Sequence, residues 1–478
     1  MAQLKIRHNV PASMADSFLN EKIARDVVRI DSSRNFKVLN KLMVISGLGY
    51  TFDAIAIALI AFILPVVIAP FHLSGIQSGI LGASTLIGYF VGATFWGLVG
   101  DKYGRKQSIQ YTLIIYAIFS LLSAFSTNFS ELTIFRIIAG FGIGGESAVI
   151  APYFSEFVPR KFRGRYTGML TGFFSFGFII SAFLGYFLVP IPNIGWRIAS
   201  IITALPIFYV IVLRFKLPES PRWLRLHGKD SEADSVLNTV TGSTELPAEI
   251  DGKPSEIYIS EIVKVLGNAK RGNSFKQIWS KAYRKRTSML WILWFTTGFA
   301  YYGFFVFVPT LLVDKGYTLI RTLSMSLLIF IMQFPGYYSA AFFIERFGRK
   351  TGVTTYMIGG AIAAILLSQS STTLEIIILA SAMSWFLNGL FGGVYIYTPE
   401  QYPTDFRTSG MGYASSFARI GAIISPIAFG ILAVSIHFSG VFVISFVVML
   451  FGAISVLILG TETKDKDLER TGSASEAL

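Results

Sequence analysis

Three ionisable residues lie near the middle of long apolar segments, where no water compensates a charge. They are Asp53, Glu146 and Arg419. An ionisable side chain at the centre of a bilayer costs roughly 2.5–3.5 kcal/mol on insertion scales. We therefore expect each of the three to be paired or to have a function.

The two acids, Asp53 and Glu146, are candidates for proton coupling. Burial favours the protonated form of a carboxyl group and a nearby cation favours the ionised form, so a proton can be bound from one side of a membrane and released to the other. The alternative is a fixed ion pair with a basic residue such as Arg136. Arg136 lies nearer the end of its apolar segment, and we expect it to be structural.

Arg419 is the most informative residue about the cargo. Its planar guanidinium matches a carboxylate at two points and does not lose its charge. An unpaired guanidinium that faces a central cavity favours an organic anion and rejects cations. A salt bridge to an acid elsewhere in the chain, or a helix-packing role, is the alternative. Gly412, Ser415 and Ser416 recur on the helical face of Arg419, as expected for a cavity lining.

Aromatic and amide side chains in other apolar segments are candidates for the rest of a substrate site. Aromatic rings also gather at lipid interfaces, so each ring has that alternative. The candidates are Trp294, Tyr301, Tyr302, Gln333, Asn388 and Tyr395.

Membrane-spanning helices must position these residues. The chain has 478 residues, of which 53% are hydrophobic and 14% charged, and its mean hydropathy is +0.58. A soluble domain cannot bury that much apolar surface, and the apolar residues come in blocks of about 20, the length that crosses a bilayer. We predict an all-α membrane protein with twelve transmembrane helices, near 43–69, 76–100, 108–127, 131–157, 165–190, 195–217, 286–313, 319–344, 351–370, 374–399, 406–433 and 437–460.

The sequence contains an internal repeat. The charged motif at 101–106 returns at 345–350, and the pattern at 153–163 returns at 397–407 with the same offset of 244 residues. Two motifs at one offset indicate two parallel copies of a six-helix bundle, joined by a polar linker with a helix near 255–268. The expected organisation is a tail at 1–41, bundles at 42–217 and 286–460, a linker at 218–285 and a tail at 461–478.

The repeated charged residues lie at helix ends on one side of the predicted bundles. Rocking one bundle against the other to open a central site would break and make contacts there. We expect one acid of each copy to face a helix amino terminus, and acid–arginine pairs to close a gate. Ordinary topology signals are the alternative reading. The candidate gating residues are Asp101 and Glu345 for the first role, Glu156, Arg163, Glu400 and Arg407 for the second, and Arg105 and Arg349 beside them.

The basic residues predict the orientation. Of the 41 Lys and Arg, 36 fall on the side that carries both tails and the linker, which is the cytoplasmic side by the positive-inside rule. We predict an integral protein of the plasma membrane with both termini in the cytoplasm. The net charge of +13 then needs no nucleic-acid partner, because the chain has no basic soluble domain.

Enzyme signatures do not emerge from the sequence. The absence of cysteine excludes disulfides, thiolate metal sites and cysteine catalysis. The four His have no metal-ligand spacing, and the chain has no Walker loop for ATP. We expect no enzyme activity, no metal and no cofactor apart from a proton as coupling ion, and a monomer whose partners are lipid and a small substrate.

Several motifs carry a family resemblance. Residues 100–106 resemble the loop signature of the major facilitator superfamily, and residues 218–223 resemble its sugar-porter and organic-ion branches. Residues 47–54, 142–146 and 397–404 resemble the nicotinate (niacin) transporters and their relatives, the synaptic vesicle glycoproteins.

The resemblance implies the major facilitator fold and a proton-coupled metabolite carrier. One departure concerns the first helix, where these relatives often have a second acid three residues after the aspartate that matches Asp53. This chain has Ala56 there. The substrate therefore does not transfer from the resemblance.

We therefore predict a secondary active transporter, a proton-coupled symporter of a small organic anion such as an aromatic monocarboxylate like nicotinate, working by alternating access. The alternative cargo is a sugar or another neutral metabolite, in which case Asp53 and Arg419 pair with other charges. An alternative of another class is a transporter-shaped membrane receptor or structural protein.

Overall fold

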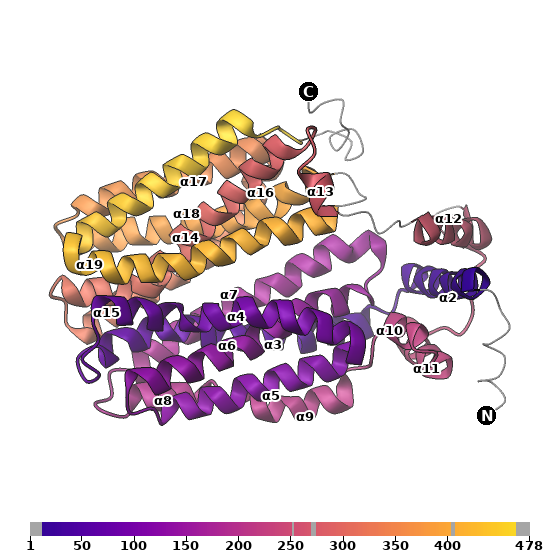
Figure 1. Ribbon diagram of the computed structural model, residues 1–478, viewed down its shortest axis with the longest axis horizontal. Coiled ribbons are helices and arrows are strands. Elements are labelled where there is room, and N and C mark those ends of the chain that lie inside the picture. The colour runs from indigo at the N-terminus through magenta and orange to yellow at the C-terminus, as the bar shows by residue number, and fades with distance from the viewer. Residues whose placement is uncertain (1–11, 251–252, 269–273, 403–406, 465–478) are drawn as a thin grey trace.

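The computed structural model describes residues 12–250, 253–268, 274–402 and 407–464. These residues are almost entirely helical (Figure 1). Twelve of the helical stretches in the described part are long and apolar enough to cross a membrane. The predicted all-α membrane fold is confirmed.

Seven helices build the first six spans. The sixth span is interrupted between residues 202 and 206, because Pro206 has no N–H to bond to the preceding turn and instead starts a new helix. The elements are α3 (Phe36–Val67), α4 (Gly75–Tyr103), α5 (Arg105–Ala124), α6 (Phe129–Ser155), the 3₁₀ turn η2 (Arg160–Phe162), α7 (Arg163–Leu188), α8 (Gly195–Ile202) and α9 (Pro206–Lys216).

The last six spans follow the same plan with two differences from the expected helices. The helix expected at 319–344 is divided at Met332, and the two expected at 406–433 and 437–460 are joined by a continuous helical backbone. The elements are α14 (Arg284–Asp314), α15 (Leu319–Ile331), α16 (Gln333–Phe347), α17 (Arg349–Gln369), α18 (Thr373–Glu400) and α19 (Arg407–Leu459).

The internal repeat is visible in how matching helices begin. Helix α6 starts after Asn128, whose side chain accepts a hydrogen bond from the backbone N–H of Glu131 at 3.0 Å. Helix α18 starts after Thr372, whose hydroxyl accepts from the backbone N–H of Glu375 at 3.3 Å. The two caps lie 244 residues apart, at the offset of the charged motifs. Each cap satisfies a backbone donor that a helix start leaves free.

The two bundles meet at one end and diverge toward the other (Figure 1). At the meeting end α4 packs closely on α19, where a Cβ on Gly79 would lie 2.7 Å from the Cα of Ile427. Further along the same two helical faces, a Cβ on Gly97 or Gly412 would meet nothing within 4 Å. The described conformation is therefore closed at one end and open at the other.

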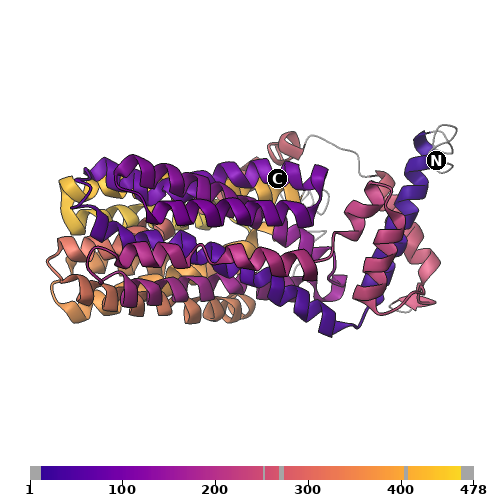
Figure 2. The same cartoon turned by 90° about the horizontal axis from the view of Figure 1, so that it is seen from below.

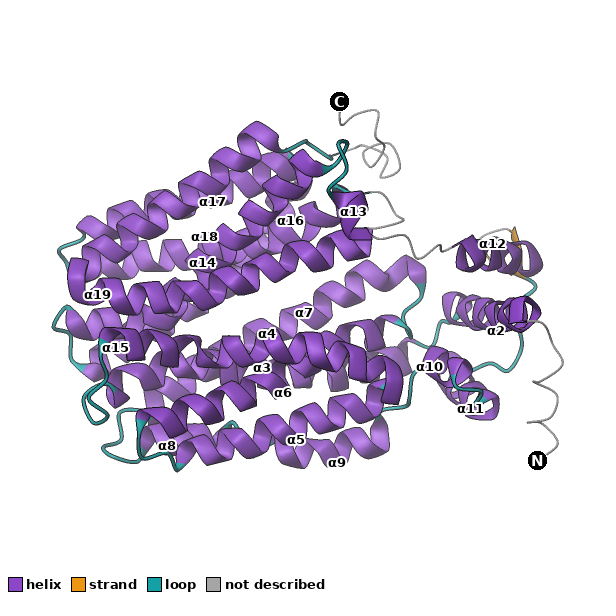
Figure 3. Cartoon of the chain, in the orientation of Figure 1, coloured by secondary structure: helices purple, strands orange, loops and turns teal. Residues whose placement is uncertain are grey.

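A small helical unit stands at the open end of the bundles, apart from the spans (Figure 2). It contains α2 (Ala12–Ser32) from the predicted tail, and α10 (Pro221–Leu226), α11 (Asp230–Thr241) and α12 (Ser255–Asn268) from the linker, followed by the short α13 (Ser274–Ile278) beside α19. The strands β1 (Glu249–Ile250) and β2 (Lys253–Pro254) form the small hairpin before α12 (Figure 3). We call α2, α10, α11, α12 and the hairpin the linker unit, and this end of the molecule the linker end.

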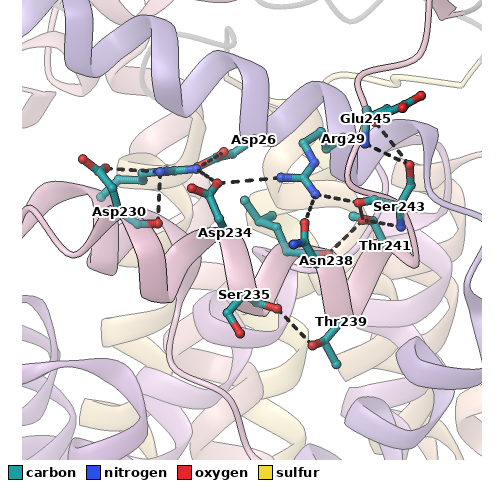
Figure 4. A network of polar contacts seen from close by, with 12 residues as sticks. Asp26, Arg29, Asp230, Asp234, Ser235, Asn238, Thr239, Thr241, Ser243 and Glu245 are labelled. Carbon is teal, nitrogen blue, oxygen red and sulfur yellow. Dashed lines mark hydrogen bonds and ion pairs between the residues drawn. The ribbon is translucent and has the colours of Figure 1, made fainter.

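The linker unit has a core and an ionic network of its own. Ala24 and Val28 of α2 are buried against Ile250 and Ile259. Arg225 forms two hydrogen bonds with Asp26, at 2.8 and 3.0 Å, and further ion pairs with Asp230 at 3.2 Å and Asp234 at 2.5 Å. Arg29 donates to Asn238 and to the Ser243 carbonyl, each at 2.6 Å (Figure 4). The predicted tail segment 12–32 is therefore a docked helix.

Candidate functional site

The two acids of the first bundle lie together, and neither forms an ion pair with another residue that the structure describes. Asp53 on α3 and Glu146 on α6 are completely buried, and their carboxyl groups interact electrostatically. Oδ2 of Asp53 accepts a hydrogen bond from the Ser147 hydroxyl at 2.9 Å. Oδ1 of Asp53 and both oxygens of Glu146 have no hydrogen-bond partner among the described residues. Two ionised carboxylates would be costly here, so the pair is suited to hold a proton.

A glycine lets the second acid approach the first helix. A Cβ on Gly49 would overlap Oε1 of Glu146, so a larger residue there would displace the Glu146 carboxyl group from this position. Gly49 lies one helical turn before Asp53 on α3. The sequence therefore places the Glu146 carboxyl group directly against the helix that carries Asp53.

Arg136 does not pair with either acid in this conformation. Its Nη2 donates to the Ala56 carbonyl at 3.0 Å, its Nε has no partner among the described residues, and the side chain is 1% exposed. No ion pair of the described residues includes it. The fixed acid–arginine pair that we considered for Asp53 and Glu146 is therefore not formed here.

Arg419 on α19 is surrounded by phenols. The ring of Tyr89 on α4, in the first bundle, lies under its guanidinium with the centroid 5.3 Å from Cζ. Tyr302 on α14 and Tyr395 on α18, in its own bundle, also interact with it electrostatically. Arg419 forms no ion pair within the described part of the chain. Arg419 as a whole residue is half-buried.

The other candidate lining residues divide into two groups. Trp294, which donates to the Thr398 hydroxyl at 2.8 Å, is 1% exposed. Tyr301 donates to Gln333 at 3.0 Å and both are buried. The Asn388 amide donates to its own helix, to the Ser384 carbonyl. These four side chains are held within the second bundle, whereas Tyr302 is half-buried and Tyr395 is 45% exposed beside Arg419.

At the linker end of the first bundle, charged residues form one connected set. Arg105 pairs with Asp101, and its Nη2 lies 3.9 Å from Oε1 of Glu156. Glu156 also accepts a hydrogen bond from the Ser220 hydroxyl, and burial raises the pKa of its carboxyl group. Oε1 of Glu219 accepts from the backbone N–H of Arg105 at 2.9 Å and from the next residue at 3.2 Å.

The second bundle repeats this arrangement. Nε of Arg349 lies 3.2 Å from Oε2 of Glu400, which accepts from the Thr463 hydroxyl at 2.5 Å. Glu462 accepts from the backbone N–H of Arg349 at 2.8 Å and from the next residue at 3.2 Å. The first two N–H groups of α5 and of α17 thus each bind one glutamate, as helix amino termini favour.

Glycine makes both of these contacts possible. Gly104 and Gly348 precede the two helices with φ of +107° and +105°. A Cβ at either position would lie 2.5 Å from Oε2 of Glu219 or Glu462. Glycine alone tolerates both the positive φ and the close approach.

The expectation that Asp101 and Glu345 face helix amino termini is wrong. Asp101 pairs with Arg105 instead, and Glu345 is exposed on α16 and forms no ion pair with another described residue. Both precede the glycine turn, while the N–H groups of the following helix point at the segments after the sixth and twelfth spans. The residues at those termini are Glu219 and Glu462.

The expected ion pairs of Glu156 with Arg163 and of Glu400 with Arg407 are not formed either. Nη2 of Arg163 donates to the Val158 carbonyl at 3.5 Å, and Nε of Arg407 donates to the Tyr402 carbonyl at 3.2 Å. Arg105 and Arg349 are the partners of the two glutamates. Residues 403–406, which belong to the second motif, lie outside the described part of the chain.

Sequence reasoning missed the glutamates at the helix starts although a signal was present. Glu219-Ser220 and Glu462-Thr463 form a further repeat, offset by 243 residues. The difference of one residue from the offset of 244 hides it from a gapless comparison. Tyr89 was missed as well, because a tyrosine in an apolar helix carries no pattern that distinguishes a binding ring from a packing ring.

Known proteins resemble the chain over nearly its whole length. The niacin transporter NiaP of Acinetobacter baylyi is 36% identical over 93% of this chain and 99% of that protein. The putative niacin/nicotinamide transporter NiaP of Bacillus subtilis is 34% identical over 90% of this chain and 98% of its own. The synaptic vesicle 2-related protein of Xenopus laevis is 28% identical over 90% of this chain and 80% of its own.

Solved transporters share the fold. The inward open conformation of the xylose transporter XylE from E. coli superimposes with a TM-score of 0.73, covering 91% of this chain and 99% of that one at 19% identity. The family described as "Sugar (and other) transporter" matches residues 25–474. The chain therefore belongs to this transporter family of the major facilitator superfamily, as the sequence motifs indicated.

Proposed function

We propose that the protein is a proton-coupled symporter of a small organic anion, an aromatic monocarboxylate such as nicotinate. The observation that carries this proposal is the guanidinium of Arg419, a half-buried residue, which has phenols around it and no carboxylate partner among the described residues. A cation that is kept inside a membrane without a counter-ion calls for an anionic ligand. The niacin transporters among its relatives agree with such a cargo.

The acid pair supports proton coupling. Asp53 and Glu146 are buried next to each other, and three of their four carboxyl oxygens have no hydrogen-bond donor among the described residues. Binding a proton lowers the net negative charge of the pair, and releasing it restores that charge. If the two conformations of the bundles stabilise that charge to different extents, protonation shifts the equilibrium between them.

Alternating access agrees with the described conformation. The bundles touch at the end away from the linker unit and leave open space at Gly97 and Gly412 near it. In our proposal the linker end faces the cytoplasm, so this conformation is open inward. Arg105 pairs with Glu156 inside the first bundle, and Arg349 pairs with Glu400 inside the second. In our proposal these four side chains exchange partners when the linker end closes.

A sugar or another neutral metabolite remains the second candidate cargo. It is favoured by the sugar transporters in the family and by the motif at 218–223, where Glu219 and Ser220 are found. Under this reading Arg419 is a structural residue, and its interaction with Tyr89 is part of the packing between the bundles.

A ligand screen on the purified protein separates the two cargoes. A ligand that binds only the folded protein raises its apparent stability by RT ln(1 + [L]/Kd). We expect nicotinate and benzoate to raise the melting temperature, and nicotinamide and neutral sugars to leave it unchanged. Stabilisation by a sugar alone, or equally by acid and amide, contradicts the anion proposal.

Transport in proteoliposomes tests the coupling and the sidedness. We expect a proton gradient directed into the liposomes, with the lower pH outside, to drive the internal concentration of the labelled acid above its external concentration. In cells, cysteines introduced at Asn193 and Thr372 should react with an impermeant reagent from outside, and one at Ser231 only after lysis. Labelling of Ser231 in intact cells contradicts the proposed orientation.

A further inference from the structure

Helices α4 and α19, from different bundles, run antiparallel along the contact between the halves. Gly79 lies against Ile427 near the closed end, and Tyr89 lies under Arg419 further along. The next glycines on these faces, Gly97 and Gly412, have open space. The contact of Tyr89 with Arg419 therefore lies where the two bundles separate.

Tyr89 is placed to be reached by a ligand. It is half-buried, like Arg419 and Tyr302. Its hydroxyl is placed to accept a hydrogen bond from Arg419, whereas the hydroxyl of Tyr301 donates to Gln333 inside the second bundle. A residue needed only for packing would be enclosed, as Tyr301 is at 5% exposure.

Tyr89 interacts both with Arg419 and with Tyr50, which is near the acid pair. Tyr50 on α3 interacts electrostatically with Tyr89 and Tyr395 on one side and with Asp53 and Glu146 on the other. The hydroxyl of Tyr50 donates to the Ser147 carbonyl at 3.2 Å. Two phenols of the first bundle, Tyr50 and Tyr89, thus interact electrostatically with each other; Tyr50 interacts with the acid pair and Tyr89 with Arg419.

We propose that Tyr89 is a specificity-determining residue, which makes the site prefer an aromatic ring attached to the carboxylate. The inference rests on the proposed function and assigns this role within it. A guanidinium binds a carboxylate along its edge and leaves its face to an aromatic ring. A planar ring that continues from the carboxylate then extends beside the Tyr89 phenol, where aromatic contact adds to the charged contact.

The position of Tyr89 has a consequence for transport. Arg419 belongs to the second bundle and Tyr89 to the first, so the substrate that we propose touches both halves at once. A ligand shifts an equilibrium only through its different affinity for the two states. An aromatic acid therefore favours the states in which the two bundles lie close around it, and an aliphatic acid that lacks the ring contact does so less.

Two acids of nearly the same size and charge test this inference. Benzoate and cyclohexanecarboxylate differ in the aromaticity of the ring, so the ratio of their Kd values isolates the ring contact. We expect the wild type to prefer benzoate, and Tyr89→Leu to weaken benzoate binding roughly two- to tenfold while changing cyclohexanecarboxylate much less. Tyr89→Phe keeps the ring and should keep the preference.

The control is Tyr111→Leu, since Tyr111 is an exposed residue on α5 away from Arg419, and this variant should bind both acids as the wild type does. An unchanged ratio in Tyr89→Leu overturns the role of Tyr89, whereas a wild type that binds neither acid overturns the proposed function instead. The ratio is measured on folded protein only. If Tyr89→Leu does not fold, Tyr89→Met takes its place with the same expected result.

Discussion

Buried charges in the linker unit and in the bundles differ in whether they have ion-pair partners. In the linker unit Arg225 is 7% exposed and binds three aspartates, Asp26, Asp230 and Asp234. Between and within the bundles, Asp53, Glu146 and Arg419 form no ion pair with any described residue.

In our proposal this difference separates charges that hold the structure together from charges that take part in transport. A buried charge surrounded by partners fixes the relative position of helices, and its removal leaves those partners unpaired. A buried charge without a partner is unfavourable in the empty state, and it is retained where a proton or a ligand completes it. The comparison predicts that changes in the bundles alter transport and that changes in the linker unit alter stability.

Asp53→Asn should have the largest effect on transport. The amide keeps the shape of the carboxyl group and its contact with Ser147 but cannot exchange a proton. We expect accumulation driven by a pH gradient to be abolished in proteoliposomes, while exchange of labelled for unlabelled substrate persists. Accumulation at the wild-type level removes Asp53 from the proton pathway. Glu146→Gln is the parallel variant.

Arg419→Lys should weaken binding of the acid. The ammonium retains the charge but cannot reproduce the two-point contact. The loss of one charge-assisted hydrogen bond, about 1.5–3 kcal/mol, corresponds to roughly a tenfold to hundredfold increase in Kd. Binding is measured by calorimetry, with melting temperature as the control for folding. Equal affinity in wild type and variant makes Arg419 a structural residue.

Arg225→Met should lower the stability of the linker unit and leave ligand affinity unchanged. The substitution leaves Asp26 buried without its cation, and breaking a buried pair costs about 3–5 kcal/mol. We expect faster hydrogen exchange in α2 and α11 by mass spectrometry. The double variant Arg225→Met/Asp26→Leu removes both charges and should recover part of the protection. A large loss of substrate affinity in Arg225→Met contradicts the division between the regions.

The smallest effect belongs to a partly exposed pair of the same unit, Lys22 and Asp230, whose Nζ and Oδ2 atoms are 2.7 Å apart. Lys22→Ala should change local stability by less than about 1 kcal/mol, because exposed ion pairs contribute little. The hydrogen bond from Lys22 lowers the pKa of Asp230. The stabilisation by this pair is therefore present above the ordinary aspartate pKa and is lost as the pH falls through the lowered one. Hydrogen exchange of α11 across pH 3–7, compared between wild type and Lys22→Ala, measures it.

The twelve spans and their division into two parallel bundles could be predicted from the sequence. Length and apolar content are local properties, and a bilayer accepts few other arrangements of such segments. The repeat at an offset of 244 residues predicts the division into two bundles, because two similar segments with the same orientation in the membrane fold into two similar six-helix bundles. The unusual positions of Asp53, Glu146 and Arg419 were likewise evident, since a charge in an apolar block needs no structure to be noticed.

Which residue meets which was decided only by the tertiary structure. The acids at the starts of α5 and α17 are Glu219 and Glu462, rather than Asp101 and Glu345, because a glycine turn directs the helix N–H groups toward distant segments. Tyr89 reaches Arg419 from the other bundle, although 330 residues separate them. Sequence patterns report the environment that a residue needs. The partner that provides it depends on how the helices pack, because contacts between distant segments leave no local pattern.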